Sequence, residues 1–224
     1  MEVIQFIQND IQRSSQQSAW KRNLLLFGVF LLPVALGILL REGLDGVFDT
    51  RTFIPNLLAI LSLTFSVSFL VRKNQPKTDF KWAMGGLLLA LYFATDRMIF
   101  PPGDRTVYSS SESFWHECFR CMGKGGATTA LVGVWLAVFA FTISSWPSRR
   151  WRGFLSMSAG IGGVIMLGFH CDSSSIEHVL VAHVGQGVLV GAFLFLAQEV
   201  FFYLRLKQAF PKLAGSIQKF RKIG

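Results

Sequence analysis

Charged side chains are scarce in this sequence. Asp, Glu, Lys and Arg make up 16% of its 224 residues, whereas hydrophobic residues make up 51%. A soluble domain carries about a quarter charged residues. Cysteine is limited to three residues, and the HExxH, GxSxG and GxxxxGK motifs of common hydrolases and phosphate loops are missing. These shortages argue against a soluble enzyme, a disordered tail and a secreted disulfide scaffold, and they predict a membrane protein that is not an enzyme.

The apolar residues are gathered into six charge-poor stretches. These stretches span 24–40, 52–71, 82–95, 125–146, 153–171 and 179–204. A helix needs about 20 apolar residues to cross roughly 30 Å of hydrocarbon, so the third stretch is long enough only if its helix continues toward Phe100. We therefore expect an all-α polytopic membrane protein. Its six transmembrane helices occupy 23–205, between a cytoplasmic segment at 1–22 and a basic cytoplasmic tail at 206–224.

Lysine and arginine are distributed unequally across this arrangement. With the amino terminus inside, 16 of the 22 basic residues fall in inner segments and 9 of the 13 acidic residues fall in outer segments. Cytoplasmic segments retain Lys and Arg, so both termini are expected in the cytoplasm. The net charge of +9 then reflects orientation and requires no nucleic acid as a partner. Glu199 is the one acidic residue inside a predicted span.

Small residues recur at helical spacing in the last two stretches. Gly187 and Gly191 form a GxxxG pair, and Ser156 with Gly160 forms a similar small-residue pair. Such pairs allow two membrane helices to approach closely, which predicts close packing of the fifth and sixth helices. The alternative, that glycine is simply common in membrane helices, stays open.

All three cysteines and all four histidines fall at or near the predicted outer face. Cys118 and Cys121 are three residues apart, whereas His178 and His183 are five apart and need not face one site. Thiol and imidazole ligands suit zinc, cadmium or copper(I). The candidate metal ligands are Cys121, Cys171, His170, His183 and His116. His183 has the strongest individual case, because ionisable residues inside a membrane usually face the bundle interior.

The same thiols support other interpretations. The outer compartment is oxidising, so Cys121 and Cys171 can instead form a structural disulfide between the fourth and fifth helices. A thiol oxidoreductase that uses Cys118 and Cys121 is conceivable, although no second pair of cysteines supports it. A disulfide, a metal or thiol sensor, and no role at all remain open at this point.

The two cytoplasmic ends have amphipathic patterns. Ile4, Ile7 and Ile11 recur at helical spacing in a segment too short to be stable alone in water, so it lies on the membrane or docks on a partner. The tail alternates basic and apolar residues, which is typical of a helix lying on anionic lipid and favours the bilayer over nucleic acid.

Three short motifs of the sequence are Phe6 to Ile11, Arg120-Cys121-Met122 and Phe169-His170-Cys171. In these motifs and in its layout the chain resembles the NrsF-type negative regulators of extracytoplasmic-function sigma factors. The resemblance implies a six-helix anti-sigma factor of the bacterial inner membrane whose amino-terminal segment sequesters a cytoplasmic sigma factor. The implied contact residues are Ile4, Phe6, Ile7, Asp10 and Ile11, and the implied sensor thiols are Cys121 and Cys171, with Cys118 additional to the two-cysteine pattern.

In this interpretation a metal ion or an oxidant at the outer thiols releases the sigma factor. A homo-oligomer is compatible with the sequence. The alternative is a small membrane redox or transport protein that uses the same His and Cys residues for haem, quinone or metal, with His170 and His183 as haem ligands.

Overall fold

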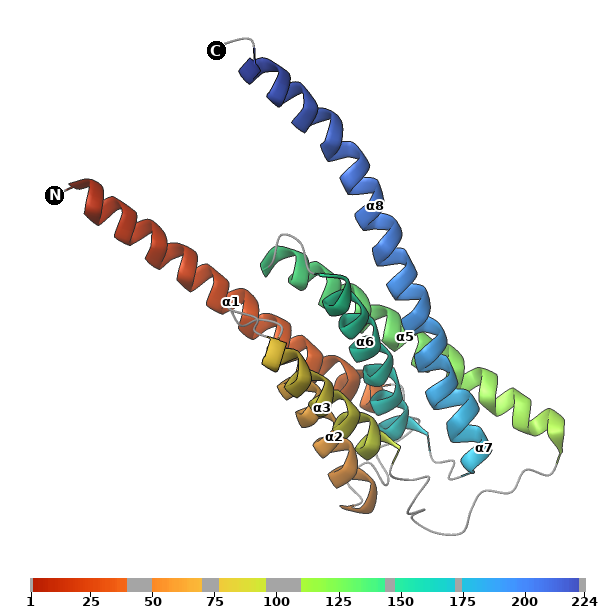
Figure 1. Ribbon diagram of the computed structural model, residues 1–224. Coiled ribbons are helices and arrows are strands. Elements are labelled where there is room, and N and C mark those ends of the chain that lie inside the picture. The colour runs from red at the N-terminus through yellow and green to blue at the C-terminus, as the bar shows by residue number, and fades with distance from the viewer. Residues whose placement is uncertain are drawn as a thin grey trace.

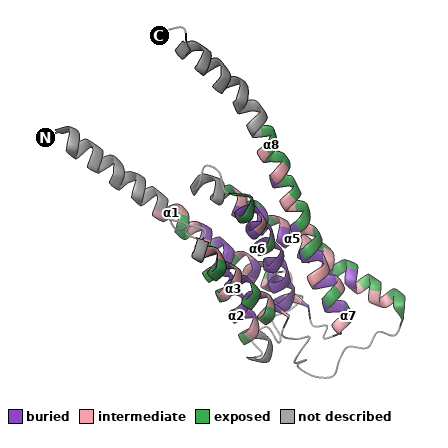
Figure 2. Ribbon diagram, viewed as in Figure 1, coloured by how far each residue is buried: buried purple, intermediate pink, exposed green. Residues whose placement is uncertain are grey.

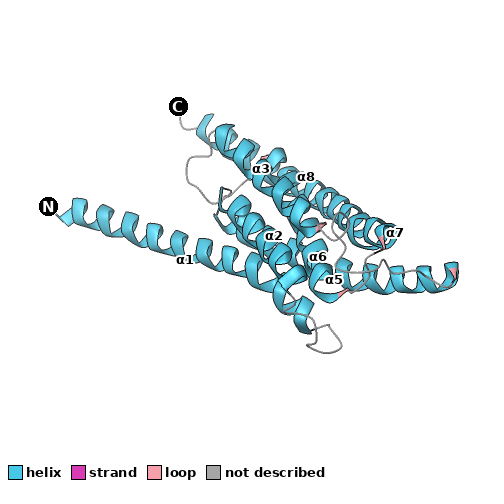
Figure 3. Ribbon diagram, turned by 90° about the horizontal axis from the view of Figure 1, so that it is seen from below, coloured by secondary structure: helices cyan, strands magenta, loops and turns pink. Residues whose placement is uncertain are grey.

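The chain is all-helical in the computed structural model. The structure describes residues 2–39, 50–69, 77–95, 110–143, 148–171 and 175–221, with backbone alone at 2–18, 50–52, 77–78, 139–143 and 205–221. No strand occurs in these ranges (Figure 3). The predicted all-α class is therefore confirmed.

The described residues form six long helices and two short helical segments (Figure 1). They are α1 (Glu2–Leu39), α2 (Thr50–Ser68), α3 (Lys77–Ala94), α5 (Ser111–Ile143), α6 (Arg149–His170), α7 (Ile176–His178), the π-helical η2 (Val179–Gly185) and α8 (Gln186–Arg221). Each of the six predicted stretches falls largely on one of the long helices. The helices α1 and α8 run without a break past residues 22 and 206, where the sequence suggested boundaries.

Four helical segments of the described chain are long and apolar enough to cross a membrane. They are Ala19–Leu39, Ser111–Val138, Arg149–His170 and Ile176–Leu204. The apolar part of α2, Phe53–Ser68, is shorter. The chain is accordingly a membrane protein by the length and composition of its helices.

The helix α6 lies at the centre of the bundle. It packs against α1, α2, α3, α5 and α8, and 83% of its candidate span is buried. Figure 2 shows α6 largely buried, while the outer helices carry exposed residues along one side. The sequence of α6 explains this position, because its many glycine, alanine and serine residues let neighbouring backbones approach.

The crossing of α6 and α8 is a contact between backbones. A Cβ atom added at Gly160 would lie 2.6 Å from the carbonyl oxygen of Gly187, and one added at Gly191 would lie 3.1 Å from that of Ser156. The predicted close packing of these two helices is confirmed. The pairs Gly187–Gly191 and Ser156–Gly160 are the surfaces that meet.

Helix α1 is tied to the two helices that lead to the cysteines. The indole of Trp135 on α5 packs against Gly28, and its Nε1 donates a hydrogen bond to the carbonyl oxygen of Leu25 at 3.3 Å. Near the other end of the span, Gly37 packs against the Cβ atom of Phe169 on α6. These contacts place α1 against both α5 and α6.

Glu199 pairs with a buried arginine. Both Nε and Nη2 of Arg152 lie 2.8 Å from Glu199 Oε1, and the Arg152 residue is only 3% exposed. The guanidinium carbon lies 4.1 Å from the ring centroid of Phe202. The acidic residue that the sequence placed inside a span is therefore one half of an ion pair between α6 and α8.

Replacing Glu199 by Gln is expected to destabilise the protein by about 2–3 kcal/mol. Removing one partner of a buried ion pair typically costs about 3–5 kcal/mol, and the Glu199 side chain retains 28% exposure, which reduces the effect. The double variant Arg152→Met, Glu199→Met is expected to lose less stability than Glu199→Gln, because no buried charge is left without a partner. Unfolding in mixed micelles with increasing dodecyl sulfate measures both, and equal losses would contradict the ion pair.

Candidate metal centre

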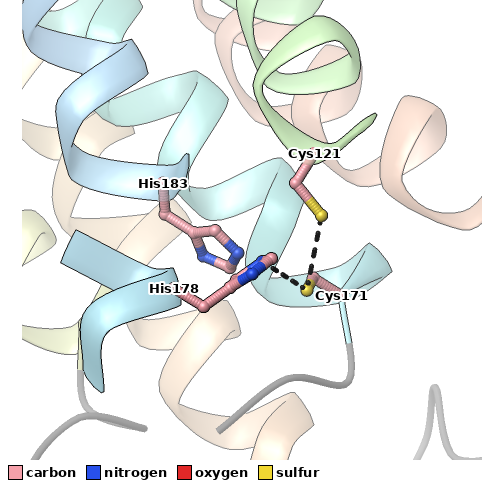
Figure 4. A group of neighbouring side chains, drawn as sticks. All are labelled: Cys121, Cys171, His178 and His183. Atoms are coloured by element: carbon pink, nitrogen blue, oxygen red, sulfur yellow. Dashed lines mark hydrogen bonds between the residues drawn. The ribbon is translucent and has the colours of Figure 1, made fainter. Parts of the chain in front are cut away.

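Two thiols and two imidazoles meet at one end of α6. Cys121 comes from α5, Cys171 directly follows α6, His178 ends α7 and His183 lies in η2 (Figure 4). All four residues are buried, and their potential ligand atoms lie within 4.8 Å of one another. The two sulfur atoms are 3.6 Å apart, and Cys171 Sγ is 3.4 Å from His178 Nε2.

The sulfur–sulfur and sulfur–nitrogen separations fit two edges of a tetrahedral metal site. Zinc binds thiolate sulfur at about 2.3 Å and imidazole nitrogen at about 2.0–2.1 Å, so two sulfurs of one tetrahedron lie about 3.8 Å apart and a sulfur and a nitrogen about 3.6 Å apart. The observed 3.6 Å and 3.4 Å are within a few tenths of these values. The donor set of two sulfurs and two nitrogens suits a soft or borderline ion such as zinc, cadmium or copper(I).

The π-helix η2 explains why both histidines reach the same site. In an α-helix, residues five apart are turned about 140° from each other. A π-helix is wider and closes its hydrogen bonds from residue i to i+5, so residues five apart lie about one turn apart. His178 and His183 thus face the same side, with ring centroids 5.4 Å apart.

The start of the helix that carries His178 is fixed by a serine cap. The Ser175 hydroxyl accepts a hydrogen bond from the backbone N–H of His178 at 3.3 Å, and it donates one to Glu177 Oε2 at 2.8 Å. A serine in this position satisfies one of the donors left open at a helix amino terminus. His178, in this capped turn, lies beside Cys171 at the end of α6.

The structure brings together three of the predicted ligands, Cys121, Cys171 and His183. His178, which the sequence analysis did not include, is the fourth member of the group. His170 Nε2 instead lies 2.8 Å from the ammonium nitrogen of Lys124. His116 is exposed on α5, five residues before Cys121 and therefore about 140° away around a regular helix. Neither His116 nor His170 belongs to the group.

Cys118 lies behind His178. Its Sγ atom is 3.6 Å from His178 Nδ1, while the other ring nitrogen faces Cys171. Both Cys118 and His178 are fully buried. Side chains that contact the second nitrogen of a ligating histidine usually orient its ring, and this is the position that Cys118 occupies.

Cys171 lies among hydrogen-bonding partners. The Cys121 thiol donates a hydrogen bond to Cys171 Sγ at 3.6 Å, and Cys171 Sγ lies 3.4 Å from His178 Nε2. The thiolate is the form of cysteine that binds metals and takes part in thiol exchange. Both kinds of chemistry would use these two sulfurs.

A disulfide and a metal ion would compete for the same two sulfurs. Cys121 and Cys171 are thiols in this structure, 3.6 Å apart, and a disulfide brings sulfurs to about 2.05 Å. Oxidation of this pair needs a further approach of roughly 1.5 Å, and it removes both thiolate ligands at once. The geometry thus allows one site to respond to an ion or to an oxidant.

The predicted partner-binding residues fall on α1. The side chains of Ile4, Phe6, Ile7, Asp10 and Ile11 lie outside the part of the chain whose side chains the structure describes. The same holds for the side chains of the basic tail. Comparison of the chain with protein-family models, with curated proteins and with solved structures finds no match.

Proposed function

We propose that the chain is an inner-membrane sensor in which a buried Cys/His centre at the outer face controls an anti-sigma segment at the cytoplasmic face. The observation that carries this proposal is the convergence of Cys121, Cys171, His178 and His183 from three parts of the chain. The sensed agent is a soft metal ion or an oxidant. The partner is an extracytoplasmic-function sigma factor, as the resemblance to the NrsF-type regulators implies.

The proposed topology has six transmembrane helices and both termini in the cytoplasm. Support comes from α6, which begins with three arginines within its first four residues and ends beside the Cys/His centre. Its 22 residues span about 33 Å, close to the thickness of the hydrocarbon core. Because basic residues favour the cytoplasmic side, the centre belongs to the outer side in this topology.

Contacts with α1 provide a physical connection between the two faces. Phe169, two residues before Cys171, packs against Gly37, and Trp135 on α5 contacts Gly28 and Leu25. A change in the spacing of α5 and α6 at the cysteines therefore acts on α1, whose helix is continuous from Glu2. Moving a two-state equilibrium from mostly bound to mostly released takes about 5.5 kcal/mol of differential binding, which a structural zinc site can supply.

Co-purification from the native membrane tests the proposal. The full chain is expected to retain a sigma factor, and deletion of residues 2–18 is expected to reduce the retained amount at least tenfold. Deletion of 208–224 serves as the matched control, because it removes the same number of residues from the other cytoplasmic end and should leave retention unchanged. Equal retention by the two deletions would overturn the anti-sigma assignment.

A further inference from the structure

An apolar groove runs along the outside of the α6–α8 contact. It has a volume of about 470 Å³. Its walls come mainly from Gly153, Met157 and Ile161 on α6 and from Val188, Ala192 and Phe195 on α8, with Leu91 of α3 at one side. Glycines in its floor leave it hollow, because they contribute no side chain at the point where the helices cross.

The length of the groove matches one leaflet of a bilayer. On α6 its lining residues extend from Gly153 to Val164, and on η2 and α8 they extend from Val184 to Phe195. Eleven residues of helix rise about 16 Å, roughly half of the 30 Å hydrocarbon core. A groove of this length accommodates a segment of an extended acyl chain that enters from the Arg149 end of α6.

One end of the groove carries positive charge. Phe195, which lines this end, lies beneath Arg149, with its ring centroid 6.0 Å from the guanidinium carbon. The Arg149 side chain is 77% exposed and lies 3.9 Å from Glu199, whose carboxylate is held at 2.8 Å by Arg152. Arg150 is also exposed. The charge of Arg152 is thus matched by Glu199, while Arg149 and Arg150 remain accessible to an anion in the headgroup region.

We propose that this groove binds one anionic phospholipid, with an acyl chain along α6 and α8 and the phosphate at Arg149 and Arg150. The groove supplies the apolar surface for the chain, and the two arginines supply the preference for a negative headgroup. A basic residue near an anionic membrane surface contributes about 1 kcal/mol, which corresponds to roughly fivefold in affinity for each arginine. This proposal is independent of the sensor function.

Native mass spectrometry of the full chain, titrated with phosphatidylglycerol or phosphatidylcholine of the same acyl chains, tests the site. The wild type is expected to bind one phosphatidylglycerol at least fivefold more tightly than phosphatidylcholine. Ala192→Phe fills the groove and is expected to weaken lipid binding at least tenfold. The matched control is Ala197→Phe, which places the same side chain at an exposed position of α8 that does not line the groove.

The role of the two arginines in headgroup preference is tested separately. Arg149→Gln with Arg150→Gln is expected to abolish the preference for phosphatidylglycerol while phosphatidylcholine still binds. Equal lipid binding by Ala192→Phe and Ala197→Phe would overturn the proposal. It would also be overturned if Ala192→Phe converted a dimer to a monomer without a change in bound lipid, because the groove would then be an interface between two copies of the chain.

Discussion

Cys171→Ser is expected to weaken cobalt(II) or zinc binding by the purified protein at least a hundredfold. Loss of a residue that only orients a ligand costs about 10–100-fold, and Cys171 is itself placed as a ligand, 3.6 Å from Cys121 Sγ and 3.4 Å from His178 Nε2. Cobalt(II) reports the ligands directly, because each thiolate adds to the sulfur-to-cobalt charge-transfer band. Competition with a coloured chelator gives the affinity.

Cys118→Ser provides the matched control for this measurement. It changes a cysteine that contacts His178 Nδ1 but lies outside the group of four. The charge-transfer intensity for each bound cobalt is expected to stay at the level of two thiolates, with a loss of affinity below the hundredfold expected for Cys171→Ser. Wild-type affinity in Cys171→Ser, or a loss of one third of the band in Cys118→Ser, would contradict the proposed ligand set.

The second large effect is expected from Gly160→Ala, a change of one methyl group. The added Cβ would meet the Gly187 carbonyl oxygen at 2.6 Å, and a backbone atom in the middle of two packed helices cannot move aside. Overpacking of this kind costs about 1–3 kcal/mol, so the variant should unfold at a lower dodecyl sulfate fraction in mixed micelles than the wild type.

The same substitution at Gly123 isolates the effect of packing. Gly123 is helical, and a Cβ there meets nothing within 4 Å. Gly123→Ala is therefore expected to stabilise the protein by up to about 1 kcal/mol through helix propensity alone. If both alanine variants shifted stability in the same direction, the close contact of α6 and α8 would not be what limits residue size at position 160.

The helices could be predicted from the sequence because a helix that crosses a bilayer needs a continuous stretch of about 20 apolar residues. Long runs without charge mark α1, α5, α6 and α8 by length alone, and the spacing of Gly187 and Gly191 identified the face of α8 that meets α6. The partner of Glu199 could not be identified in this way. Arg152 is 47 residues away, and only the packing of α6 against α8 brings the two side chains together.

Three of the four residues of the Cys/His group were predicted from the sequence, and the fourth was missed for a physical reason. Sorting residues by membrane side placed Cys121, Cys171 and His183 at one face, and all three belong to the group. His178 was missed because the five-residue spacing was judged by α-helical periodicity, whereas the backbone at 179–185 is π-helical. A π-helix depends on tertiary contacts and has no simple sequence signature. His170 and His116 are close to the group along the chain, but His170 contacts Lys124 and His116 is exposed.

The π-helical segment also sets the angular position of α8 as a whole. Relative to an α-helix, η2 holds about one additional residue, and each residue corresponds to about 100° of rotation. If η2 became α-helical while α7 stayed in place, every later side chain would turn about the helix axis by that amount. Glu199, about 24 Å along the helix from His183, would then face away from Arg152. The register that brings two histidines together at one face is thus the same register that aligns an ion pair at the other.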